Sequence, residues 1–242
     1  MQNRMVRAMI ALCFILAAGG CEQVVNIDLH NTGPQIVVEG LVSDHAGPYT
    51  VSLSRTGTYF TPELTFPPVS GATVMIQDNM GELDTLRENT SGVYTSKTVR
   101  GIPGVTYALI VNAEGGVYTG SSTMPQNVPI DSMFAVSRRP NSPVGAGYDL
   151  YIAFKDPPEI GNYYRINVRI NNPVIPGDSV DGRRYRLYSD KLSNGTETAY
   201  RVRLRRHVSA GDTVTVDLMS IDKPTYEYYR TLDNSHSNRS NI

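Results

Sequence analysis

Cysteine is scarce in this sequence: its 242 residues include two, Cys13 and Cys21, both close to the amino terminus. The chain beyond Cys21 therefore has no disulfide framework to stabilise it. Tryptophan is absent, whereas tyrosine occurs 15 times. The folded part must be stabilised by burial of apolar surface, with tyrosine as its main aromatic residue.

The sequence also lacks a charge excess and, after Cys21, a long apolar run. The formal net charge is -1, so no overall field attracts nucleic acid, and the absence of tryptophan removes the best stacking residue for single strands. No apolar run beyond Cys21 reaches the ~20 residues that cross a bilayer. We therefore expect no nucleic-acid partner and no spanning helix in that part of the chain.

Motifs that carry chemistry are missing as well. None of the four histidines, His30, His45, His207 and His236, stands at metal-ligand or triad spacing from another. No Gly-x-Ser-x-Gly elbow, phosphate-binding glycine loop or His-Glu-x-x-His helix occurs. The segment 178–182 loosely resembles a calcium loop but lacks the distal glutamate, so a polar hairpin turn is the better interpretation. We expect no catalytic residues, no bound metal, no cofactor and no enzymatic activity.

The amino terminus carries an export signal. Arg4 and Arg7 precede a short apolar run, 8–18, and small residues lead directly into Cys21. This resembles a bacterial lipobox, although Ala18 stands where leucine is usual. The resemblance implies a lipoprotein signal peptide over residues 1–20, cleavage before Cys21, and acylation of that cysteine. The alternatives are an ordinary secretory signal cut near Ala18, which leaves Cys21 free, or an uncleaved short anchor.

The rest of the chain predicts an all-β fold. Gly and Pro number 21 and 15, and short β-branched runs alternate with turns, as in antiparallel sandwiches. Residues 49–54 alternate strictly, which places Tyr49, Val51 and Leu53 on one face. Residues 162–171 are expected to form another strand, with Tyr164, Ile166, Val168 and Ile170 on one face. Residues 83–88 are expected to form one short strand, and residues 189–198 a polar loop.

These patterns divide the chain into segments. Residues 21–34 are expected to be a tether, 35–124 an amino-terminal antiparallel sandwich of the immunoglobulin or transthyretin type, and 125–129 a proline-rich linker. Residues 130–233 form a second β-rich domain with a short carboxy-terminal helix over 224–232, for which Asp222 is a suitable cap. Residues 234–242 are polar and are expected to be disordered.

An arginine stripe is the most distinctive charged feature. Three arginines alternate with apolar residues on one expected strand, and two more precede them on another strand; they are Arg201, Arg203, Arg205, Arg184 and Arg186. A solvated outer sheet face explains the pattern. The sharper interpretation is a patch that binds lipid phosphates or an acidic partner, because guanidinium groups suit both anions.

Five tyrosines invite a similar choice: Tyr163, Tyr164, Tyr185, Tyr188 and Tyr200. They could line a carbohydrate or receptor contact. Tyrosine is also simply a good strand residue, and that interpretation is favoured.

Three segments together carry a family resemblance. They are Cys21–Val25 followed by Ile36–Gly40, Tyr49–Thr56 leading to Val69–Val74, and Ser220–Lys223 before Tyr226, Tyr228 and Tyr229. In this order they resemble the Bacteroidetes outer-membrane lipoproteins catalogued as domain of unknown function 4249. The resemblance implies a β-sandwich domain, a second β-rich domain, outer-membrane attachment and often a neighbouring TonB-dependent receptor. It implies no catalytic residues.

We therefore expect a non-enzymatic cell-envelope lipoprotein, anchored to the outer membrane through Cys21, that is accessory to a TonB-dependent receptor in nutrient uptake. The alternative is a glycan- or small-ligand-binding lipoprotein that acts alone. A hydrolase assembled from scattered Asp, Glu and Tyr residues is a third hypothesis. The side of the outer membrane that the protein faces is open, because Glu22 is the only acidic residue before Asp28.

Overall fold

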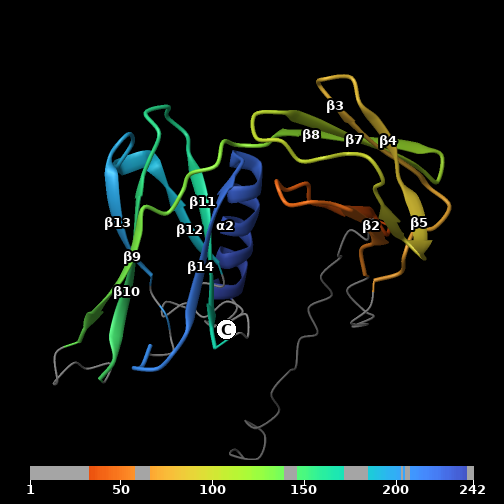
Figure 1. Ribbon diagram of the computed structural model, residues 1–242. Helices are drawn as coiled ribbons and strands as arrows, with labels where there is room; N and C mark the ends of the chain where they lie inside the picture. The colour runs from red at the N-terminus through yellow and green to blue at the C-terminus, as the bar shows by residue number, and fades with distance from the viewer. Residues whose placement is uncertain are drawn as a thin grey trace, which may run out of the picture. The chain divides into compact units, whose positions relative to one another are not determined.

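The computed structural model describes residues 33–57, 66–138, 146–171, 185–202, 204 and 208–238. Antiparallel sheets and one carboxy-terminal α-helix make up the fold, which confirms the all-β class expected from the sequence (Figure 1). The chain divides into two compact units, residues 1–35 and 36–242. All the sheets belong to the second unit.

The first lobe of this unit contains two four-stranded sheets, with strand orders β1-β2-β6-β5 and β4-β3-β7-β8. Its strands are β1 (Ile36–Gly40), β2 (Thr50–Arg55), β3 (Thr73–Asp78), β4 (Leu83–Thr85), β5 (Arg87–Thr90), β6 (Val93–Thr95), β7 (Thr106–Ala113) and β8 (Gly116–Thr123). Apolar residues of β2, β3, β6 and β7 face a core that both sheets share.

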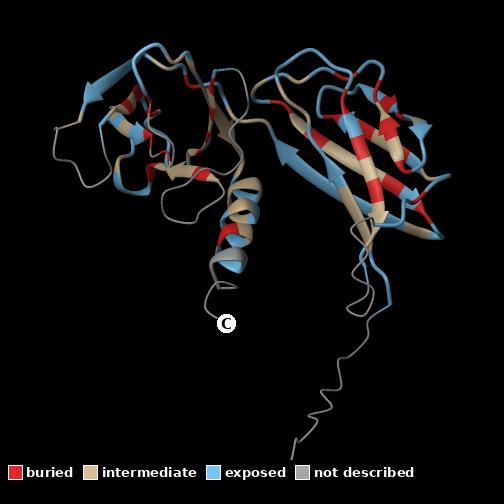
Figure 2. Cartoon of the chain, turned by 90° about the horizontal axis from the view of Figure 1, so that it is seen from below, coloured by how far each residue is buried: buried red, intermediate tan, exposed pale blue. Residues whose placement is uncertain are grey.

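The period-two pattern explains this core. Tyr49, Val51 and Leu53 lie on one face and are buried, as the sequence predicts. Val74 and Ile76 of β3 join the same cluster from the other sheet. Figure 2 shows such buried residues as red segments of the strands and exposed residues as pale blue segments. The lobe is therefore a β-sandwich.

One segment departs from the expected strand pattern. Residues 83–88 were expected to be a single strand, but β4 pairs with β3 in one sheet and β5 pairs with β6 in the other. Leu86 lies between them, is buried, and donates its N–H to the carbonyl of Val74. The chain crosses from one sheet to the other at Leu86, whose side chain is buried in the core that the two sheets share.

The second lobe has two three-stranded sheets, with strand orders β13-β10-β9 and β12-β11-β14. The strands are β9 (Ser132–Ser137), β10 (Tyr148–Lys155), β11 (Tyr163–Ile170), β12 (Arg186–Ser189), β13 (Glu197–Val202) and β14 (Val214–Ile221), with a 3₁₀ turn, η1, over Asp190–Leu192. β13 begins earlier than expected, because Glu197 and Thr198 pair with Lys155 and Phe154 of β10.

The core of this lobe is aromatic at its centre. Phe154 of β10 packs against Tyr164 and Tyr188 at ring-centroid distances of 5.2 and 5.7 Å. The even-numbered residues of β11 are all buried, which confirms the predicted alternation. Tyr164 donates its hydroxyl to Asp156 Oδ1 at 2.6 Å. Burial, reinforced by this bond to a carboxylate, raises the pKa of Tyr164 well above its ordinary value, so the group remains a donor.

The helix α2 runs over Lys223–Asn238. Asp222 caps it, since its Oδ1 accepts the N–H of Thr225 at 2.8 Å. The helix continues past Leu232, where the sequence pattern ends it, to Asn238. The buried side chain of Asp233 in this extension accepts the N–H of Tyr185. Across the described residues no helix has both the length and the hydrophobicity needed to cross a bilayer.

α2 packs through tyrosines against the sheet that contains β11. Tyr226 lies 4.8 Å from Tyr163, and Tyr229 lies 4.5 Å from Tyr185, measured between ring centroids. The guanidinium of Arg165 sits over the Tyr229 ring and bonds its hydroxyl at 2.7 Å. Tyr163, Tyr164, Tyr185 and Tyr188 thus have structural packing roles in this lobe.

Candidate functional site

A groove within residues 36–242 encloses about 1030 Å³. Four stretches of chain contribute to its lining: the end of β1 with the following loop and the start of β2, the end of β8 with residues 124–130, the second half of β14, and the start of α2. The full lining is Gly40–His45, Tyr49–Val51, Ile76, Tyr107, Leu109, Gly120–Ser122, Met124, Pro125, Asn127–Ile130, Arg169, Asp217–Asp222, Pro224 and Thr225.

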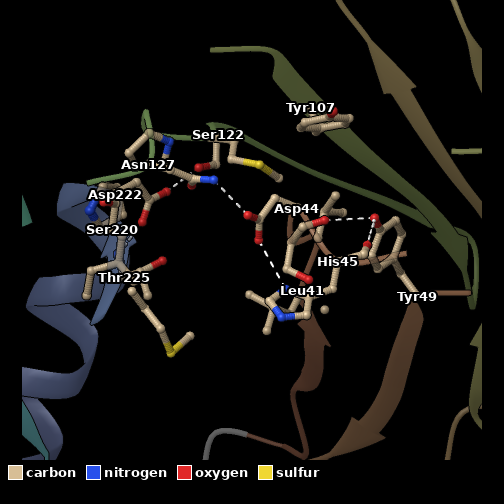
Figure 3. A pocket seen from close by; sticks show the side chains of 18 of the residues that line it. Leu41, Asp44, His45, Tyr49, Tyr107, Ser122, Asn127, Ser220, Asp222 and Thr225 are labelled. Atoms are coloured by element: carbon tan, nitrogen blue, oxygen red, sulfur yellow. Dashed lines mark hydrogen bonds and ion pairs between the residues drawn. The ribbon is translucent and has the colours of Figure 1, made fainter. Parts of the chain in front are cut away.

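Tyr49 holds one wall of the groove in place. Its hydroxyl oxygen lies 2.7 Å from the carbonyl oxygens of both Ser43 and His45 (Figure 3). The same oxygen accepts the N–H of Gly101 at 2.9 Å. Gly101 has no room for a side chain, because a Cβ there would lie 1.9 Å from the Ser43 carbonyl oxygen. This close approach fixes the loop after β1 against residues 100–102.

A carboxylate, Asp44, lies on the same loop. Asp44 accepts a hydrogen bond from Asn127 Nδ2 at 2.8 Å and lies 3.1 Å from His45 Nδ1. The bond from Asn127 is the main cause that lowers the pKa of Asp44, with His45 adding to it and partial burial opposing it. Figure 3 shows the amide of Asn127 directed at this carboxylate. Asp44 is therefore ionised at neutral pH and places a negative charge in the lining of the groove.

A second carboxylate of the lining, that of Asp222, lies between β14 and α2. Ser122 Oγ donates to Asp222 Oδ2, and the other oxygen of Asp222 caps the helix. Both oxygens of this carboxylate are thus in use. Within the ranges described above, no cluster of three His, Cys, Asp or Glu residues could hold a metal ion.

The rest of the lining is mainly apolar, with Leu41, Leu109 and Met219 among its members. Concave apolar surfaces with a few placed polar groups bind small or amphipathic molecules by burying their apolar parts. Asp44, Asn127 and Ser122 are polar groups set among these apolar walls, which makes the groove a candidate ligand site.

Only two of the five arginines of the predicted patch, Arg186 and Arg201, lie within the described residues. Arg184, Arg203 and Arg205, like Cys21, lie outside the described residues. Arg186 is buried on β12, whereas Arg201 lies on β13 in the other sheet of the lobe. The structure therefore does not bring these two arginines together in an exposed patch. The patch interpretation of the other three stays a prediction.

Arg201 has a carboxylate partner. Its Nη2 lies 2.8 Å from Asp149 Oδ2, and Arg138 Nε lies 2.7 Å from Asp149 Oδ1. Although burial of Asp149 acts in the opposite direction, the two guanidinium groups hold its pKa below the ordinary value. Arg201 thus joins β13 to β10 through an ion pair on the outer face of the sheet.

The groove itself was not identified from the sequence. Its residues are far apart in the chain and come from several expected strands, the 125–129 linker and the start of the expected helix, none of which carries a ligand signal of its own. The one local signal was proline at both ends of that linker, which indicates a stiff segment but no ligand.

Comparison with known proteins gives one result at the family level. A family model described as Domain of unknown function (DUF4249) matches residues 22–242. Searches among curated proteins and among solved structures found no significant match.

Proposed function

Since the chain belongs to the DUF4249 family, whose description specifies no activity, we propose its function from the features above. We propose that it is a non-enzymatic lipoprotein of the outer membrane, anchored through Cys21 and accessory to a TonB-dependent receptor in nutrient uptake. Its β-rich lobes would then present binding surfaces at the end of a tether.

The position of Cys21 carries this proposal. The family match begins at residue 22, directly after the cysteine that ends the run of small residues. A lipoprotein processed before Cys21 would keep the whole family region and lose only the signal. Two or three acyl chains bind a membrane durably, at about 0.8 kcal/mol per buried CH₂, so such a protein is held at the bilayer without spanning it.

Co-purification tests the proposal. We expect the tagged protein, extracted from outer membrane with detergent, to bring down a β-barrel receptor at near-equal stoichiometry. The Cys21→Ser variant should leave the membrane fraction and capture at least tenfold less receptor, because it is no longer confined to the same bilayer. Recovery of the wild-type protein alone would contradict the receptor role. Identical solubility of both proteins would contradict the anchor.

The groove favours a second candidate, a lipoprotein that binds a glycan or a small ligand by itself. Its volume and its mainly apolar walls are those of a small-molecule site. Tyr49 and Tyr107 lie in its lining, and each hydroxyl is bonded to backbone groups, which fixes the rings.

Leu41 provides the test of the groove. It lines the groove and is 64% exposed, so we expect Leu41→Glu to fold normally and to weaken binding of the apolar dye Nile red about tenfold, since the new carboxylate must be desolvated. Fluorescence titration measures the affinity. Leu83→Glu is the matched control, because Leu83 is 54% exposed and lies outside the groove. Equal effects of both substitutions would exclude the groove as the dye site.

A further inference from the structure

Strand β9 is an edge strand without the usual protection. All six of its residues, Ser132–Ser137, are exposed, and Met133, Phe134 and Val136 are 48%, 43% and 48% exposed. It contains no charged residue and no proline. Soluble proteins normally protect such edges with lysine, proline or a bulge, because an open apolar edge pairs with other chains.

The backbone of β9 has hydrogen-bonding groups available on its outer side. β9 pairs only with β10 among the described strands, in one unbroken register. Arg138 N–H bonds the carbonyl of Gly147 at 2.9 Å in that register. Because bonding alternates along an antiparallel ladder, Phe134 and Val136 also bond to β10. The N–H and C=O groups of Met133, Ala135 and Ser137 therefore point to the free side.

The sandwich is also open beside this edge. Ring contacts place β11 over β10 and β12 over β13, so the sheet orders place β14 over β9. Met133 shares its face with the buried Ile152 but is itself half exposed. Val216 and Leu218 of β14 are only partly buried. A strand added next to β9 would cover apolar surface as well as satisfy the backbone.

The edge is complementary to itself. If two copies pair antiparallel about Ala135, Ala135 faces Ala135 of the second copy and Met133 faces its Ser137, and all of these have free backbone groups. Phe134 then lies beside Val136 of the second copy on the outer face, where an apolar cross-strand pair is favourable. Directly opposed residues share a face, so the two inner faces remain on the same side. No like charges meet.

We propose that β9 is a homodimerisation edge. Two copies of the chain join through it into one six-stranded sheet with the order β13-β10-β9-β9-β10-β13, and a twofold axis passes beside Ala135. Isologous pairing of this kind closes after two copies, so it leaves no β9 edge free for further growth. The inference is independent of the proposed receptor.

Sedimentation equilibrium of the Cys21→Ser protein tests the dimer, since this background has neither an anchor nor a thiol at position 21. We expect a dimer at micromolar concentration. Ala135→Pro removes one N–H from the free side without breaking a bond to β10, and it should raise the dimer dissociation constant at least 100-fold. Val136→Lys places two like-charged side chains near the seam and should raise it about tenfold.

Val117→Lys on β8 is the matched control, because Val117 is an exposed apolar residue, 68% exposed, on another edge strand; it should leave the dimer unchanged. Circular dichroism checks the fold of each variant, and Val136→Lys remains informative if Ala135→Pro does not fold. A monomeric parent protein would overturn the proposal. So would a dimer that survives Val136→Lys, or a receptor captured through β9 in place of a second copy.

Discussion

Replacing Phe154 by alanine is expected to lower the free energy of unfolding of the second lobe by about 4 kcal/mol. The side chain is fully buried and contacts the rings of Tyr164 and Tyr188. Its removal loses the transfer free energy of the ring and leaves a cavity that neighbouring strands cannot close. Urea denaturation followed by circular dichroism measures the change.

Two companion variants sharpen this test. Phe154→Leu keeps most of the apolar volume and should cost less than half as much. Phe66→Ala removes the same ring from a position that is 60% exposed, and the change should stay within about 0.5 kcal/mol. If Phe154→Ala and Phe66→Ala destabilise equally, Phe154 is not a core residue.

Asp84→Ala is expected to destabilise the first lobe by about 3 kcal/mol. The carboxylate is buried, and its Oδ2 accepts the N–H groups of Lys97, Thr98 and Val99 at 2.7, 2.7 and 3.0 Å. Alanine leaves these donors without their shared acceptor. Glu82→Ala, which removes an exposed carboxylate from the turn before β4, is the control and should have little effect. Urea denaturation of both variants decides the point.

Lowering the pH should reduce the difference in the free energy of unfolding between the wild type and Asp84→Ala. Burial acts to raise the pKa of Asp84, but the three backbone hydrogen bonds outweigh it, and the folded-state pKa lies below the ordinary 3.8. A depressed pKa means that the stabilisation is complete above the unfolded-state value and is lost as pH falls through the folded-state value. We expect a constant difference between pH 5 and 7 that shrinks below about pH 4. A difference that grew in acid would contradict this.

Phe154→Ala in the second lobe and Asp84→Ala in the first lobe also test the domain boundary predicted at 125–129. Separate hydrophobic clusters fill the two lobes, one from Tyr49 to Ala113 and the other from Val128 to Val208. If the lobes unfold independently, each substitution should speed hydrogen exchange in its own lobe alone. Peptide-resolved exchange is the suitable measurement, because the chain has no tryptophan to report on one lobe by fluorescence.

Much of the fold follows from local patterns. The alternation along β11 predicts which residues are buried, since a strand's side chains point to opposite faces in turn. The helix start at Asp222 follows from capping chemistry, because the aspartate meets the free N–H of Thr225. These features depend on residues that are close in sequence, so the sequence alone predicts them.

Sheet membership could not be predicted in the same way. Arg186 and Arg201 lie on strands with similar patterns, yet one is buried and the other is ion-paired in a different sheet. The groove depends on Asp44, Asn127 and Asp222, which only the folded chain brings together around it. Long-range pairing decides such features, and no local period encodes it.

The crossing at Leu86 has a consequence for how the first lobe opens. Residues 83–90 supply a strand to each sheet. The two sheets of this sandwich are therefore joined covalently by one short, continuous segment of the chain. Peeling β4 from its neighbour pulls directly on β5 across the core. Partial opening of a single layer is therefore penalised, and the lobe should behave as one cooperative folding unit.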